Sequence, residues 1–129
     1  MIQRQFELLG KGGCYFFCLW KLARDITGTY KDPYRLYVEA IDKGFLTEDC
    51  WVQDPAKLME LATEQLRWTV FHAPPEYQPA QGEYEILRYE WKTPTGQLAH
   101  FVLPDWDPYG DSLTRRYGRI VSKRILRRV

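Results

Sequence analysis

The chain has 129 residues, with 18 Lys and Arg against 17 Asp and Glu. This length suits a hydrophobic core of ordinary size, so we expect residues 1–129 to form a single domain. No apolar run is long enough to span a membrane and no signal-peptide core begins the chain, so we expect a cytoplasmic protein without membrane association. The three cysteines lack the pattern of a small secreted domain, and we expect them to be reduced thiols.

The most apolar part of the chain follows a pair of glycines near its beginning. Cys14 is succeeded by large or apolar residues as far as Trp20, and helix-compatible residues continue to Gly28. We predict a helix over residues 14–27, with Gly28 as the left-handed residue that ends it. Because the first half is apolar on nearly all sides, this helix should be buried.

Two further helices are predicted from cap and proline signals. The Asp-Pro pairs at 32–33 and 54–55 place a side-chain cap before a first helical residue, where proline is tolerated. Apolar residues then recur at helical spacing after each pair. We therefore expect helices over residues 33–43 and 55–65.

The second half of the chain has the pattern of strands. The proline-dense segment 73–82 is predicted to be a surface loop. Strands 84–91 and 98–103 flank a Thr-Pro-Thr-Gly turn and should form a hairpin. The predicted strands cover residues 68–71, 84–91, 98–103, 112–117 and 119–126. N-terminal helices followed by an antiparallel sheet predict an α+β fold of two packed layers.

Charge is unevenly distributed along the chain. No acidic residue follows Asp111, whereas seven basic residues do: Arg115, Arg116, Arg119, Lys123, Arg124, Arg127 and Arg128. A basic segment can bind nucleic acid or an acidic partner. Apolar residues lie between these charges and indicate that the segment also packs. We therefore favour the solvated face of a strand and do not expect nucleic acid as a partner.

A cysteine at the start of a buried helix is a candidate nucleophile. The partial positive charge of a helix N-terminus favours thiolate over thiol, so we expect a lowered pKa for Cys14. His100, in the hairpin, could accept the thiol proton and return it to a leaving group. The alternatives are a cysteine that packs as a small apolar side chain and a hydrogen-bonded core histidine.

A third group would have to accept the other N–H of the imidazole, and Asp105 and Asp107 are the candidates. If Leu103-Pro104 is a two-residue turn, position 107 pairs with position 100, and Asp107 lies on the same face as His100. Asp105 would then point to the opposite face, and a slip of one residue would exchange the two. We favour Asp107.

Three short motifs together resemble those of compact, bacterial papain-like cysteine peptidases. They are Gly-Gly-Cys14-Tyr at a helix start, His100-Phe-Val-Leu in a strand and Asp107-Pro-Tyr-Gly after it. The pattern is most similar to the peptidases that cut double-glycine leaders and more distantly to NlpC-type cell-wall endopeptidases. The chain also resembles a small family of uncharacterised spirochaete and phage-associated proteins.

The resemblance implies a papain-like fold and a cysteine peptidase or amidase. Cys14, His100 and Asp107 would be its catalytic triad, and its substrate would be a peptide or resemble peptidoglycan. Such enzymes usually hold the oxyanion with a glutamine about six residues before the cysteine. Leu8 occupies that position, so Gln5 is the candidate donor. This departure leaves open an inactive papain-like module that binds peptide, glycan or, through its basic segment, nucleic acid.

Neither a metal nor an organic cofactor is expected. Cys14, Cys18 and Cys50 could ligate zinc together with His72 or His100, but no spacing matches a zinc ribbon or finger. The sequence carries no signal for an oligomeric state.

Overall fold

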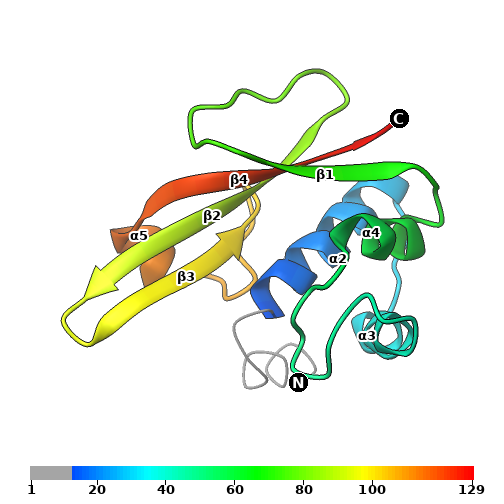
Figure 1. Ribbon diagram of the computed structural model, residues 1–129, viewed down its shortest axis with the longest axis horizontal. Helices are drawn as coiled ribbons and strands as arrows, with labels where there is room; N and C mark the ends of the chain where they lie inside the picture. Colours follow the sequence, from blue (N-terminus) through cyan, green and yellow to red (C-terminus); the bar gives the residue numbers. More distant parts are fainter. Residues whose placement is uncertain (1–12) are drawn as a thin grey trace.

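The computed structural model describes residues 13–129, where helices precede a four-stranded antiparallel sheet (Figure 1). The helices are α2 (Gly13–Thr27), α3 (Pro33–Asp42), α4 (Pro55–Thr63) and the short α5 (Leu113–Tyr117). The strands are β1 (Trp68–Ala73), β2 (Tyr84–Thr93), β3 (Gly96–Val102) and β4 (Arg119–Arg128). The predicted α+β class is confirmed.

The helix ends follow the cap signals in the sequence. Gly28 after α2 has a φ of 69°, a left-handed conformation that glycine adopts without steric cost. The side chains of Asp32 and Asp54 accept backbone N–H groups from the first turns of α3 and α4, at 3.3 and 3.0 Å. α4 is shorter than predicted because Glu64 adopts a φ of 58° and ends the helix.

The order of strands in the sheet is β1-β4-β2-β3. The predicted hairpin is confirmed, with Thr93 opposite Gly96 at its turn. The predicted strand at 119–126 is also confirmed, and as β4 it lies inside the sheet between β1 and β2 (Figure 1). β3 is an edge strand, and α2 packs against it.

Residues 112–117 do not form the predicted strand, because Ser112 caps a helix there. The Ser112 Oγ accepts the N–H of Arg115 at 3.2 Å, which satisfies a donor in the first turn of α5. After α5, a Cβ at Gly118 would approach the Thr114 carbonyl oxygen to 2.3 Å, so glycine is required where α5 meets β2. A helix of five residues is too short for its periodicity to be recognised in the sequence.

The N-terminal helices pack on the sheet as predicted, and one short helix, α5, also lies on the opposite face. The longer helices lie on one face, and α5 lies against β2 and β3 on the other (Figure 1). Tyr117 of α5 contacts Trp91, which alternates to the face opposite Arg88. None of the helices within residues 13–129 has the length and apolar character needed to cross a membrane.

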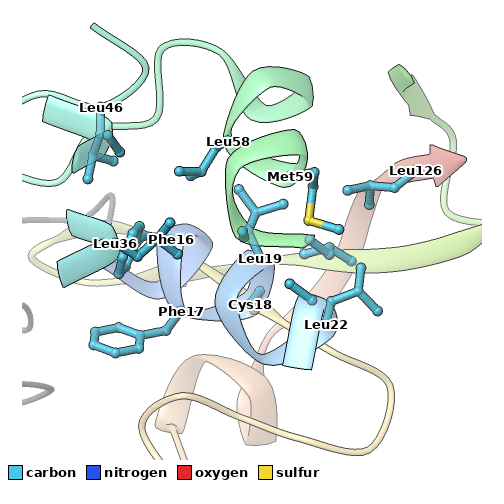
Figure 2. Packing of buried hydrophobic residues seen from close by; sticks show 14 of the residues in the cluster. Phe16, Phe17, Cys18, Leu19, Leu22, Leu36, Leu46, Leu58, Met59 and Leu126 are labelled. Atoms are coloured by element: carbon cyan, nitrogen blue, oxygen red, sulfur yellow. The ribbon is translucent and has the colours of Figure 1, made fainter. Parts of the chain in front are cut away.

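The main core of the described chain lies between α2, α3, α4 and one face of the sheet (Figure 2). α2 is buried as predicted, and its Phe16, Cys18 and Leu19 side chains are fully enclosed. Full burial of one such apolar side chain stabilises the fold by roughly 1.5–3 kcal/mol. Packing along α2 therefore fixes the first turn of this helix, which carries Cys14, beside β3.

Candidate active site

Cys14 is buried where α2 begins, next to the edge strand β3. Its side chain is 2% exposed, and its Sγ accepts the backbone N–H of Phe101 at 3.4 Å. Some N–H groups of an edge strand do not donate to a neighbouring strand, and the Phe101 N–H of β3 donates to the thiol instead. The sulfur therefore contacts the backbone directly after His100.

Burial raises the pKa of the Cys14 thiol above its ordinary value, because a buried thiolate loses its hydration. Hydrogen bonds from the N–H groups of Phe101, Tyr15 and Cys14, and from the Tyr109 side chain, lower this pKa. Burial has the larger effect. The lowered pKa predicted from the helix N-terminus alone is therefore wrong for the free protein.

His100 and Asp107 form a buried pair. The His100 Nε2 lies 2.7 Å from the Asp107 Oδ1, so the predicted contact between them is confirmed. The other ring nitrogen, Nδ1, is buried and has no hydrogen-bond partner among residues 13–129. With Asp107 accepting the proton of Nε2, the ring is held in the tautomer that keeps a lone pair on Nδ1.

The surroundings of the His100 ring favour its neutral form. Burial lowers its pKa from the ordinary value, and the hydrogen bond and charge of Asp107 only partly oppose this effect. A neutral imidazole with a free lone pair can accept a proton. The shifts of both pKa values thus favour an uncharged pair, the Cys14 thiol and the neutral His100 imidazole.

Asp107 is fixed by donors from the turn that follows it. Burial opposes its ionisation, but hydrogen bonds from Ser112, His100 and Tyr109 lower its pKa. The Ser112 hydroxyl donates to Oδ2 at 2.6 Å, and the Tyr109 backbone N–H donates to Oδ1 at 2.9 Å. The carboxylate thus remains charged and oriented toward the imidazole.

The turn before Asp107 differs from the predicted one. Leu103 and Trp106 form the pair that closes it, with N–H to oxygen distances of 2.8 and 3.3 Å, so the turn residues are Pro104 and Asp105. The register is shifted by two residues from the predicted pairing. An even shift preserves the alternation of faces, so Asp107 still reaches His100 while Asp105 is exposed.

Tyr109 and Ser112 are site residues that the sequence did not reveal. The Tyr109 ring stacks on the His100 ring, with centroids 4.4 Å apart and 18° between the planes. Ser112 both holds Asp107 and caps α5. The Asp-Pro-Tyr-Gly motif favours an Asp side chain bonded to the backbone two residues later, which would have indicated the Tyr109 N–H contact but not the stacking.

The remaining candidates do not join this site in the described chain. Gln5 lies outside the described residues. Cys18 and Cys50 are fully buried, and burial raises the pKa of each thiol. Within residues 13–129 there is no group of three or more side chains that could hold a metal ion.

Comparisons with known proteins identify a family but not an activity. A family model described as "Protein of unknown function, DUF261" matches residues 3–128. Neither the curated proteins nor the solved structures give a match.

Proposed function

This chain belongs to the DUF261 family, and we propose that it is a papain-like cysteine hydrolase, a peptidase or amidase that cleaves a peptide or isopeptide bond. One observation carries the proposal. Asp107 binds the His100 ring through Nε2, and the buried Nδ1 has no hydrogen-bond partner in the described chain. The next residue, Phe101, contacts the Cys14 Sγ through its backbone N–H. The order of helices before an antiparallel sheet supports a papain-like fold.

The first step of this mechanism is proton transfer from a neutral thiol. Burial raises the pKa of Cys14 and lowers that of His100, so the resting pair is thiol and imidazole rather than thiolate and imidazolium. As the sulfur attacks the substrate carbonyl carbon, the thiol proton passes to the His100 Nδ1. The charged Asp107 stabilises the imidazolium that forms.

The second step releases the amine and leaves an acyl-enzyme. The C–N bond breaks, the leaving nitrogen takes the proton from Nδ1, and a thioester joins the acyl group to Cys14. Water then attacks the thioester, with His100 again as base, and the carboxylic acid product leaves as the thiol is restored. The backbone N–H of Cys14 is one donor for the oxyanion, since the first N–H groups of a helix have no partner within it.

The burial of the site favours a second candidate, an inactive papain-like module that binds peptide or glycan. Cys14 and His100 are each only 2% exposed. Tyr109 lies over the His100 ring and hydrogen-bonds to Cys14. A substrate carbonyl would reach the sulfur only after Tyr109 moved, whereas a binding module needs no such movement.

Hydrolysis of a library of quenched-fluorescent peptides separates these candidates. We expect cleavage by the wild type, loss of at least about a hundredfold in His100→Ala through removal of the general base, and complete loss in Cys14→Ala. Cys18→Ala is the matched control, because it removes a thiol one turn deeper in the same helix. Cleavage that survives Cys14→Ala would contradict the proposal, and peptide binding without any cleavage would favour the second candidate.

A further inference from the structure

A cavity of about 620 Å³ is lined by Tyr15, which follows Cys14, and by Phe101, whose backbone N–H contacts the Cys14 thiol. Its sheet side includes Arg88, Phe101 and Arg124, and Tyr15 of α2 lies on its helix side. Successive strand residues point to opposite faces, so Phe101 faces this cavity while His100 faces the Asp107 side. The Cys14 thiol contacts the backbone between them.

The Phe101 ring contacts two arginines that line the cavity. The Arg88 and Arg124 Cζ atoms lie 6.0 and 5.3 Å from the centroid of the Phe101 ring. The Tyr15 ring stacks on the same phenyl ring, with centroids 4.5 Å apart. Stacking restricts the guanidinium groups, so less freedom is lost when they bind an anion.

The two arginines differ in the partners that they have. Arg88 forms an ion pair with Glu90, which also accepts a hydrogen bond from Gln97. Arg124 donates to the Ser122 Oγ at 3.0 Å and to a backbone carbonyl at 3.4 Å, but no carboxylate lies within ion-pair distance of it in residues 13–129. The described walls of the cavity thus carry about one uncompensated positive charge, at Arg124.

Tyr15, which carries a hydroxyl donor, lines the same cavity as Arg124 and contacts the same Phe101 ring. The Tyr15 Oη is buried and has no hydrogen-bond partner among the described residues. Burial raises the pKa of Tyr15, and the neighbouring Arg124 charge only partly opposes this, so the hydroxyl keeps its proton. A guanidinium beside an O–H group presents donors that suit a carboxylate.

We propose that this cavity binds a carboxylate, the acidic side chain of a peptide, through Arg124 and Tyr15. One uncompensated charge matches a monoanion better than a phosphate dianion, and the stacked guanidinium suits planar bidentate binding. That the ligand is a substrate rests on the proposed function: Tyr15 and Phe101 both flank the thiol, so an acidic residue in the cavity would lie close to the bond that Cys14 attacks.

NMR titration of the full chain with N-acetylglutamate, N-acetylglutamine and inorganic phosphate tests the site, with the indole N–H of Trp51 in the cavity wall as reporter. We expect saturable binding of N-acetylglutamate and affinities at least about tenfold lower for N-acetylglutamine and phosphate. The amide lacks the charge that pairs with Arg124, and the phosphate dianion does not match the single positive charge of the cavity. Equal binding of the glutamate and glutamine compounds would overturn the proposal. Tighter binding of phosphate would also overturn it.

Variants assign the binding to named atoms. Arg124→Gln should weaken N-acetylglutamate at least about tenfold, and Tyr15→Phe, which retains the stacked ring, should weaken it about threefold or more. Arg119→Gln is the matched control, because it removes an exposed arginine from the same strand. Unchanged affinity in both Arg124→Gln and Tyr15→Phe would contradict the assignment.

The failure of this inference can be told apart from the failure of the proposed function. Binding of N-acetylglutamate without peptide cleavage would support the carboxylate site and count against the hydrolase. Cleavage with no preference for acidic over amide side chains, together with no N-acetylglutamate binding, would support the hydrolase and count against the carboxylate site.

Discussion

The Tyr109 ring lies nearly parallel to the His100 imidazole at a centroid distance of 4.4 Å, and its side chain also hydrogen-bonds to Cys14. Tyr109 is 38% exposed, whereas the two residues that it contacts are almost fully buried. One partly exposed side chain therefore contacts both the thiol and the imidazole, and we expect it to affect both the pKa of the thiol and the access of solvent to the base.

Substitutions of Tyr109 should separate these two effects. Tyr109→Phe retains the stacking and removes the hydrogen bond that lowers the pKa of Cys14, so we expect alkylation of Cys14 to slow about two- to threefold at fixed pH. Tyr109→Ala uncovers the site and should speed alkylation. Iodoacetamide incorporation followed by intact mass measures both rates. Identical rates in all three proteins would contradict a covering role for Tyr109.

The three thiols should differ in reactivity, and all should react slowly at acidic pH. Burial raises each pKa, so the thiolate fraction grows only as pH rises above neutrality. We expect Cys14, which has hydrogen-bond donors and lies next to the partly exposed Tyr109, to be alkylated first. Peptide mapping after partial alkylation gives the order. As a control, denaturant should make the three rates similar; fastest labelling of Cys50 in the folded protein would contradict the expected order.

Acid should destabilise the protein in the range where free histidine titrates. The folded-state pKa of His100 is lowered from 6.5, so the unfolded chain binds the proton more readily and stability falls as pH drops below about 6.5. The lowered pKa of Asp107 adds a further loss below about 4. We expect the urea midpoint to decrease between neutral pH and pH 5, and less steeply in His100→Gln.

His72 provides the control for this acid effect. Partial loss of hydration and the nearby Arg124 charge also lower the pKa of His72, but its side chain is largely exposed, so His72→Gln should leave most of the loss of stability in place. Parallel pH profiles for wild type and His100→Gln would show that His100 is not the residue responsible.

The ion pair between Lys123 and Glu85 should contribute more to stability than the ion pair between Arg127 and Glu83, because Lys123 is buried and Arg127 is half-exposed. The Lys123 Nζ lies 2.7 Å from a Glu85 carboxylate oxygen and donates to the Tyr77 carbonyl at 2.8 Å. Lys123→Met leaves Glu85 without its partner, and we expect a loss of about 3 kcal/mol in the free energy of unfolding. Arg127→Met removes a half-exposed partner at 3.6 Å from Glu83, whose carboxylate keeps its hydrogen bonds from Tyr77 and Ala80, so we expect a loss of less than about 1 kcal/mol. Urea unfolding measures both, and equal losses would contradict this difference.

Nucleic acid should bind weakly and only at low salt. The basic residues of segment 115–128 do not form one free surface: Lys123 pairs with Glu85, Arg127 pairs with Glu83, and Arg124 faces the cavity. Each phosphate contact adds about one unit to the slope of log affinity against log salt concentration. Binding that depends on only a few such contacts should therefore be lost at physiological salt. Fluorescence polarisation with labelled DNA and RNA checks this. A submicromolar complex that persists at physiological salt would contradict it.

Local signals accounted for much of the fold. The caps at Asp32 and Asp54 and the left-handed Gly28 depend on neighbouring residues only, and each was predictable. The contact of His100 with Asp107 was predictable for a different reason: the register was wrong by two residues, but sheet alternation repeats every two.

Features that depend on distant parts of the chain could not be predicted in the same way. The raised pKa of Cys14 results from its burial beside β3, which the helix sequence does not specify. The stacking of Tyr109 depends on the path of a turn. The position of β4 between β1 and β2 is set by pairings over long sequence separations, and strand propensity does not determine it.

This strand order has a consequence for biosynthesis. Among the strands of residues 13–129, β1 pairs only with β4, so it lacks a strand partner from this part of the chain until residues 119–128 have been synthesised and have left the ribosome. The β2–β3 hairpin can close earlier, because its pairings are local. Until then the nascent chain exposes the apolar side chains that β4 later covers, and such surfaces are prone to aggregation. Arg124 belongs to β4, so the arginine of the cavity that lacks a carboxylate partner reaches its position only when β4 pairs with its neighbouring strands.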